Sequence, residues 1–139
     1  MILLDTNVLS ALMRATPEPA VGHWLDAQPV ESVWTTTITI FEVHFGLALL
    51  PRGRRRDGLE AAFAHATAVI LRGRVLAFDQ PAAREAAAMA AERRLQGRTV
   101  DFRDVQIAGI AAARRATLAT RNTRHFEDLG VALVNPWSA

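Results

Sequence analysis

Met1-Ile2-Leu3-Leu4-Asp5-Thr6-Asn7-Val8-Leu9 opens the chain, and this segment is the most informative about the fold. Its apolar start is typical of a buried strand in a parallel sheet, which we expect over residues 2–5. Asp5 comes at the carboxyl end of that strand, where open α/β sheets place their binding groups. Asp5 also has a simpler explanation, because Asp is a favoured N-cap for a following helix.

The rest of the chain alternates strand-like and helix-like segments, which predicts an α/β fold with a central parallel sheet flanked by helices. We expect this fold to form a single domain over residues 1–139. The further strands are expected at 33–36, 75–78, 118–120 and 131–134. Helices are expected from Thr6 or Asn7 to about 14, through Trp24 and Leu25, and over 37–50, 57–72, 79–96 and 105–115. We expect Thr37 or Thr39 to cap the 37–50 helix, and Asp101 is a candidate cap in a loop at 98–103.

Composition excludes several classes of protein. Half of the residues are hydrophobic, which argues against disorder, and the lack of cysteine excludes disulfides, thiolate metal sites and a cysteine nucleophile. No apolar run has membrane-spanning length and no secretory signal is recognised, so we expect a cytoplasmic protein without a membrane role. All 16 basic residues are arginine, and they concentrate in residues 52–74 and 93–124. Such clusters suit either nucleic-acid phosphates or a solvated face.

Two further acids recur near the starts of later helices. Glu42 lies beside an apolar stripe formed by Ile38, Phe41, Phe45 and Leu49. The helix dipole alone would favour an acid in the first turn. Asp104 precedes an almost wholly apolar helix, and it could share a capping role with Asp101. In a parallel sheet, however, the strand-to-helix junctions open on one edge. Carboxylates gathered there repel one another unless a cation joins them, and Mg²⁺ or Mn²⁺ accepts such oxygen ligands.

Five motifs in a fixed order carry a family resemblance over essentially the whole chain. They are Leu4-Asp5-Thr6-Asn7-Val8-Leu9, Glu42 with Gly46, Asp104-Val105-Gln106-Ile107-Ala108, Ala119-Thr120-Arg121-Asn122-Thr123 and Asn135-Pro136-Trp137. The set resembles the PIN-domain family, in particular VapC-type toxin ribonucleases and their Fit-type relatives. The resemblance implies a parallel α/β fold, Mg²⁺- or Mn²⁺-dependent RNA cleavage, dimers or higher heteromers, and a small antitoxin partner. Operator DNA would be bound only through the DNA-binding domain of that antitoxin.

The resemblance also implies roles for single residues. Asp5, Glu42 and Asp104 match the three main acids of the family. Asn122 stands at a fourth position that is often acidic, and its neutral side chain puts a full second metal site in doubt. The remaining polar residues of these motifs could orient water or phosphate, or could simply make turn and cap hydrogen bonds; they are Thr6, Asn7, Thr120 and Thr123.

Four arginines in the turn after Pro51 are the predicted contacts to the RNA backbone, with a solvated loop tip as the alternative: Arg52, Arg54, Arg55 and Arg56. The four histidines show no paired ligand spacing and are expected at the surface or in packing: His23, His44, His65 and His125. Trp24, Trp34 and Trp137 are expected in the core or at an interface.

The expected function is a metal-dependent endoribonuclease, the toxin of a type II toxin–antitoxin pair, that hydrolyses phosphodiesters with a water activated by the cation. The alternative is a non-catalytic or weakly catalytic subunit of a DNA-binding regulatory complex with an antitoxin-like partner. The three acids do not distinguish the two functions, because a regulatory subunit could retain them as well. A haloacid-dehalogenase-type phosphatase is excluded because Asn7 stands where it needs a second Asp. Receiver domains and Walker P-loops are excluded because the chain has no lysine.

Overall fold

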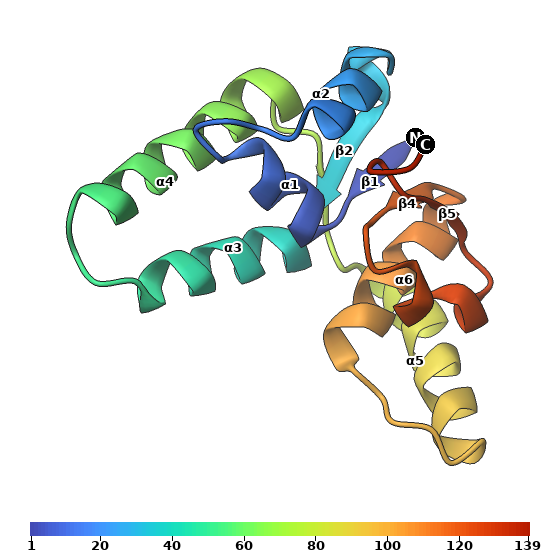
Figure 1. Ribbon diagram of the computed structural model, residues 1–139. Coiled ribbons are helices and arrows are strands. Elements are labelled where there is room, and N and C mark those ends of the chain that lie inside the picture. Colours follow the sequence, from blue (N-terminus) through green and yellow to red (C-terminus); the bar gives the residue numbers. More distant parts are fainter.

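A five-stranded parallel sheet in the order β3-β2-β1-β4-β5 organises the computed structural model, which describes residues 1–139 (Figure 1). Its strands are β1 Ile2–Leu4, β2 Val33–Thr36, β3 Val75–Leu76, β4 Thr117–Ala119 and β5 Ala132–Val134. The central strand β1 pairs in parallel with both neighbours, so that Leu3 lies opposite Trp34 and Leu118. The five predicted strands and their parallel arrangement are therefore confirmed.

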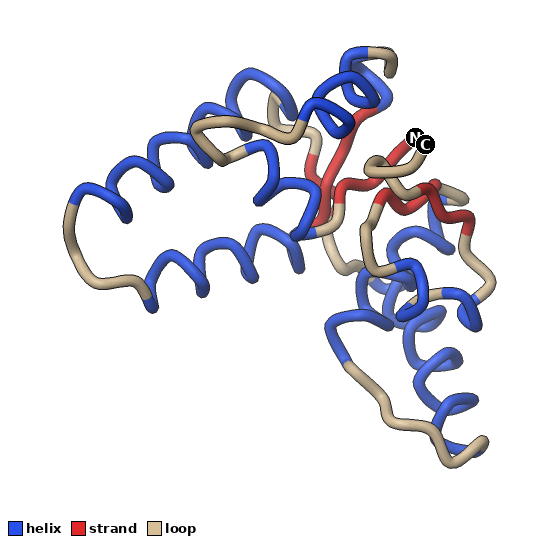
Figure 2. Tube along the Cα trace, in the orientation of Figure 1, coloured by secondary structure: helices blue, strands red, loops and turns tan.

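The helices are much longer than the strands that they connect (Figure 2). They are α1 Thr6–Leu12, α2 Pro19–Asp26, α3 Thr37–Leu49, α4 Arg54–His65, α5 Gln80–Leu95 and α6 Phe102–Arg114. A π-helical turn, Ala66–Leu71, continues α4, and three 3₁₀ turns cover Val30–Ser32, Thr123–His125 and Glu127–Leu129. None of these helices combines the length and apolarity that crossing a membrane requires.

Alternating side chains of β1 separate two cores, because successive strand residues point to opposite faces of a sheet. Leu4 packs with residues of α1, α2, α3 and α4 on one face. Leu3 packs on the other face with residues of α5 and α6. Both leucines are fully buried, which explains why the opening stretch reads as a continuous apolar run.

Gly109 lets α6 approach α5 closely. A Cβ added to Gly109 would lie 2.6 Å from the carbonyl oxygen of Ala82 and 2.8 Å from the Cβ of Ala86. Real Cβ atoms do not approach backbone that closely, so any larger residue would push the two helices apart. The small residues at this contact hold α6, and with it Asp104, against the sheet.

Several expected boundaries are wrong by a few residues. The helix predicted over 57–72 begins at Arg54, so Arg54, Arg55 and Arg56 lie in its first turn rather than in a loop. The helix α6 begins at Phe102, inside the predicted 98–103 loop, because Asp101 caps it. The cap of α3 is Thr36 and not Thr37 or Thr39, since the Thr36 hydroxyl accepts from the backbone N–H of Thr39. β3 ends at Leu76, two residues earlier than expected.

Most of the apolar stripe expected on α3 does not face the core, and only Ile38 of its four residues packs against it. Phe41, Phe45 and Leu49 are 59%, 51% and 69% exposed, whereas Val43 and Leu47 on the same helix are buried. Apolar residues surround much of α3, so the sequence pattern did not distinguish its inner face from its outer one. The helix therefore presents an apolar surface to the outside, with the rings of Phe41 and Phe45 stacked at 6.0 Å.

Candidate active site

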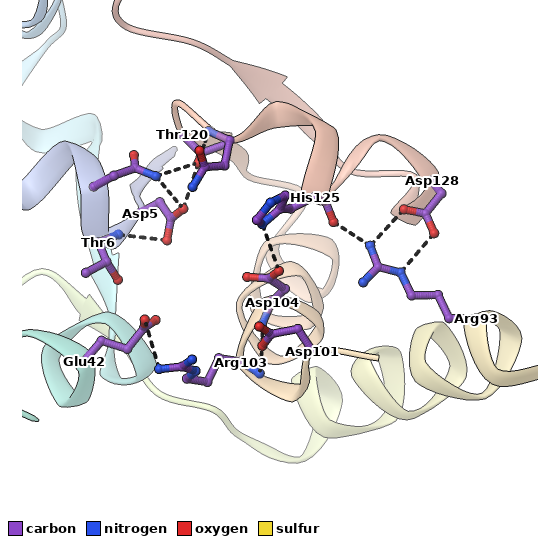
Figure 3. Close-up of polar contacts among 12 residues, drawn as sticks. Asp5, Thr6, Glu42, Arg93, Asp101, Arg103, Asp104, Thr120, His125 and Asp128 are labelled. Atoms are coloured by element: carbon purple, nitrogen blue, oxygen red, sulfur yellow. Dashed lines mark hydrogen bonds and ion pairs between the residues drawn. The ribbon is translucent and has the colours of Figure 1, made fainter. Parts of the chain in front are cut away.

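Three carboxylates from distant parts of the chain line one cleft of about 510 Å³. Asp5 follows β1, Glu42 lies in the second turn of α3, and Asp104 lies in the first turn of α6. They meet because α1 and α3 both begin at the carboxyl ends of neighbouring parallel strands, and α6 packs close to α3. Figure 3 shows the three side chains around this common space.

Asp5 is both a helix cap and a residue of the cleft. Its Oδ1 accepts a hydrogen bond from the backbone N–H of Thr6 at 2.8 Å, and its Oδ2 accepts from the Thr120 hydroxyl at 2.8 Å and from the Asn7 amide at 3.4 Å. Burial raises the pKa of Asp5, while the hydrogen bonds from Thr120 and Thr6 oppose that rise. Several donors thus hold this carboxylate in one orientation.

Glu42 faces the same cleft from α3. Burial raises the pKa of Glu42 and the charges of Asp5 and Asp104 add to the rise, while the nearby Thr6 hydroxyl and the Arg103 guanidinium oppose it. The Arg103 Nη1 lies 3.7 Å from the Glu42 Oε2. Because Glu42 lies in the second turn of α3, the interpretation as a first-turn dipole acid is wrong.

Asp104 has His125 as its partner, a residue that the sequence analysis had assigned to the surface or to packing. The His125 Nδ1 lies 3.4 Å from the Asp104 Oδ2 (Figure 3). Burial and the neighbouring charge of Asp101 raise the pKa of Asp104, and His125 opposes the rise. Asp104 is not the cap of α6, because Asp101 accepts the hydrogen bonds from the backbone N–H groups of Arg103 and Asp104.

A partly buried ion pair holds the turn that carries His125. Arg93 on α5 donates from its Nε and Nη2 to the two carboxylate oxygens of Asp128, at 3.0 and 2.9 Å, and also donates to the carbonyl of His125. Bidentate Arg–carboxylate pairs fix geometry as well as charge. No spacing in the sequence predicts that His125 belongs to the site, because its contact with Asp104 depends on the packing of α5 against the 123–129 segment.

The polar residues of the motifs behave differently from one another. Asn7 and Thr120 are hydrogen-bonded to each other at 3.3 Å as well as to Asp5, and the Thr120 hydroxyl also accepts from the backbone N–H of Asn122 at 3.1 Å. The side chains of Thr6 and Trp137 each contain a buried polar atom without a hydrogen-bond partner, and both residues line the cleft. Asn122 lines it too, whereas Thr123 does not.

The four arginines near residue 54 lie away from the cleft. Arg56 forms an ion pair with Glu60 at 2.8 Å and donates to the carbonyl of Leu50, so it supports the connection between α3 and α4. The arginines that line the cleft are instead Arg14, Arg103 and Arg121. The sequence placed two of these three within its second arginine-rich segment, 93–124, without singling them out.

The residue types of the cleft fit a divalent cation. Burial raises the pKa values of all three carboxylates, and mutual repulsion adds to the rise for Glu42 and Asp104. A positive charge among them would therefore stabilise their ionised forms. Their oxygens, together with the unpaired Thr6 hydroxyl, are the hard ligands that Mg²⁺ and Mn²⁺ prefer. The three carboxylates do not lie close enough together to form a metal site as they stand. Arg103 lies beside Glu42 and His125 lies beside Asp104.

Known proteins resemble this chain in sequence and in fold. The family model of the PIN domain matches residues 2–132. The chain is similar to "VapC ribonuclease Y4jK" of Sinorhizobium fredii, with 41% identity over 99% of this chain and 98% of the relative. It is also similar to "Toxin FitB" of Neisseria gonorrhoeae, with 36% identity over 99% of both chains. The solved structure of FitAB bound to the IR36 DNA fragment superposes with a TM-score of 0.87, at 36% identity, over 99% of this chain and 96% of that one.

Proposed function

Because the chain belongs to the PIN domain family, we propose that it is a metal-dependent endoribonuclease and the toxin of a type II toxin–antitoxin pair. The observation that carries the proposal is the convergence of Asp5, Glu42 and Asp104 on one cleft at the carboxyl edge of the sheet. The similarity to a relative named as a VapC ribonuclease supports the choice of RNA as substrate.

Asp5, Glu42 and Asp104 would hold one Mg²⁺ or Mn²⁺. A cation bound there supplies a water of lowered pKa and offsets the negative charge of the phosphate. Thr120 and Asn7 orient Asp5 through their hydrogen bonds, and Asn122, as a neutral acceptor, would contribute a weak ligand. Asp5 is almost completely buried and Glu42 and Asp104 are largely so, which limits competition by water for the cation.

The exposed apolar face of α3 supports a protein partner. Phe41, Phe45 and Leu49 are all more than half exposed on one helix, and contiguous exposed apolar surface marks an interaction site. The solved FitAB structure on DNA supports the assignment of that partner as a small antitoxin with a DNA-binding domain, through which alone operator DNA would be reached. We infer that the toxin also pairs with a second copy of itself.

The exposed arginines at the start of α4 remain proposed outer contacts to the RNA backbone. Arg52, Arg54 and Arg55 form no ion pair, and their charges lie near the surface. Arg56 joins the same proposal, although its partners Glu60 and Leu50 already hold it.

Cleavage of RNA by the partner-free protein tests the function. Purified protein should cut single-stranded RNA in Mn²⁺ or Mg²⁺ and lose the activity in EDTA, and Asp104→Asn should be inactive while remaining folded by circular dichroism. Protein that binds an antitoxin and operator DNA but never cleaves RNA with either cation would support the alternative, a regulatory subunit without catalysis.

A further inference from the structure

Arg121 differs from the other two arginines of the cleft because no carboxylate pairs with it. Arg14 lies 3.7 Å from Glu18, and Arg103 lies 3.7 Å from Glu42. The guanidinium of Arg121 instead lies over the ring of Trp137, with its Cζ 4.9 Å from the ring centroid. The negative charges that line the cleft all belong to carboxylates, and none of them forms an ion pair with the Arg121 guanidinium.

The backbone of Arg121 is tied to Asp5 by a short chain of hydrogen bonds. Its N–H donates to the Asn7 Oδ1 at 3.1 Å, and the Asn7 amide donates to the Asp5 Oδ2 at 3.4 Å. The residues on both sides of Arg121 are held as well, since Thr120 donates to Asp5 and the N–H of Asn122 donates to Thr120. The position of Arg121 relative to Asp5 is therefore determined by the fold.

Trp137 provides a fixed surface for this guanidinium. Its backbone N–H donates to the Asn135 Oδ1 at 2.9 Å in the turn after β5, and its ring packs against the core on the α1 side of the sheet. A cation over an indole face is attracted by the ring quadrupole, which restricts the long arginine side chain without neutralising its charge.

We propose that Arg121, held over Trp137, binds a phosphate of the RNA backbone next to the phosphodiester that is cleaved. The planar guanidinium offers paired N–H donors that match two phosphate oxygens, and its charge is free to make that contact. Trp137 acts as a positioning residue through Arg121. This inference rests on the proposed nuclease function and names a substrate contact within the same site.

The test compares Arg121→Gln with Arg124→Gln, which removes the same charge three residues later. Arg124 is exposed and does not line the cleft. Binding of a short labelled single-stranded RNA is measured in EDTA across salt concentrations, and cleavage is measured in Mn²⁺. Arg121→Gln should weaken binding about 10- to 100-fold, as expected for a hydrogen-bonded charge. It should also reduce the slope of log affinity against log salt by about 0.7.

Three further measurements separate binding from a purely structural effect. In Mn²⁺, Arg121→Gln should raise KM with a much smaller change in kcat, and Arg121→Lys should recover part of the affinity because it keeps the charge without the fork. Trp137→Leu should weaken RNA binding about 2- to 5-fold with an unchanged salt slope. Arg124→Gln should match the wild-type protein, and all variants should bind Mn²⁺ with wild-type affinity.

The outcomes distinguish this inference from the proposed function. If the wild-type protein cleaves RNA but Arg121→Gln binds it with unchanged affinity and slope, the Arg121 assignment is wrong and the nuclease stands. Equal losses in Arg121→Gln and Arg124→Gln would also overturn it, since general charge would then explain both. If wild-type protein binds RNA without cutting it, the nuclease proposal fails, and the placement of Arg121 next to a cleaved phosphodiester fails with it. A wild-type protein that binds no RNA refutes both.

Discussion

Replacing Asp5 by Asn should leave the stability of the metal-free protein almost unchanged and should abolish its stabilisation by Mn²⁺. The substitution keeps the size of the side chain and removes its charge. Asn can still accept a hydrogen bond from the backbone N–H of Thr6. Its NH₂ group, however, would face the Thr120 hydroxyl, which donates to Asp5 in the wild-type protein. Loss of that hydrogen bond costs about 1 kcal/mol.

A second effect opposes this cost. Because burial raises the pKa of Asp5, its ionised form destabilises the metal-free fold at neutral pH, and a neutral side chain relieves that. The two effects have opposite signs, so the metal-free stability of Asp5→Asn should stay within about 1 kcal/mol of wild type. For a chain of this length that is a shift in Tm of about 3–5 °C.

Metal-bound stability should respond very differently. A cation that binds only the folded protein, at about 100 times its Kd, adds about 2.7 kcal/mol. The wild-type Tm should therefore rise by about 8–13 °C in Mn²⁺. Asp5→Asn should show almost none of this rise, because it lacks a charged ligand. Differential scanning fluorimetry with and without Mn²⁺, and calorimetric titration, measure both quantities.

Asp26→Asn provides the matched control. Asp26 is an exposed carboxylate at the end of α2, outside the cleft, so its Mn²⁺ shift should equal that of wild type. The reasoning is refuted if Asp5→Asn keeps the full Mn²⁺ shift, since Asp5 would then not be a ligand. An equal loss in Asp26→Asn would show that the shift reports general surface charge and not the cleft.

Three other predictions address the cleft and its support. Asn122→Asp adds a fourth carboxylate to the cleft, so calorimetry should detect tighter Mn²⁺ binding and a second event at high concentration; titrations identical to wild type would show that this position does not set metal occupancy. Without metal, stability should fall as pH rises above the ordinary carboxyl range of about 4, through the raised pKa values of Asp5, Glu42 and Asp104, because the unfolded chain ionises first. Urea unfolding at a series of pH values should show this fall, and a variant with all three acids neutralised should lack it. Gly109→Ala should destabilise the protein by about 1–2 kcal/mol in urea, since overpacking against Ala82 exceeds the gain in helix propensity; unchanged stability would mean that α5 and α6 separate without cost.

Local patterns were sufficient to predict much of the fold. The apolar run before Asp5 predicts β1, and the alternation of short apolar segments with longer helical ones predicts the parallel sheet. Boundaries were less certain, because helix starts depend on which residue caps. Asp101 rather than Asp104 begins α6, and Thr36 rather than Thr37 caps α3. Both caps lie one to three residues from an equally suitable neighbour.

The apolar positions of α3 show the limit of pattern analysis. Phe41 and Val43 are both apolar, yet Phe41 is 59% exposed and Val43 is 6% exposed. The helix has one apolar face toward the core and another toward the outside, and hydrophobicity alone does not distinguish them. Only the position of the sheet and of α4 decides which face is buried.

The order of the elements and the choice of Asp5, Glu42 and Asp104 as candidate site residues could be read from the sequence, because strand ends, caps and isolated acids are local features of the chain. Only the folded chain shows which basic side chains line the cleft and what each of them contacts. Arg103 lies by Glu42, His125 by Asp104, and Arg121 over Trp137. These contacts join residues that are far apart in the sequence, and they depend on the packing of whole helices and turns, which no local pattern encodes.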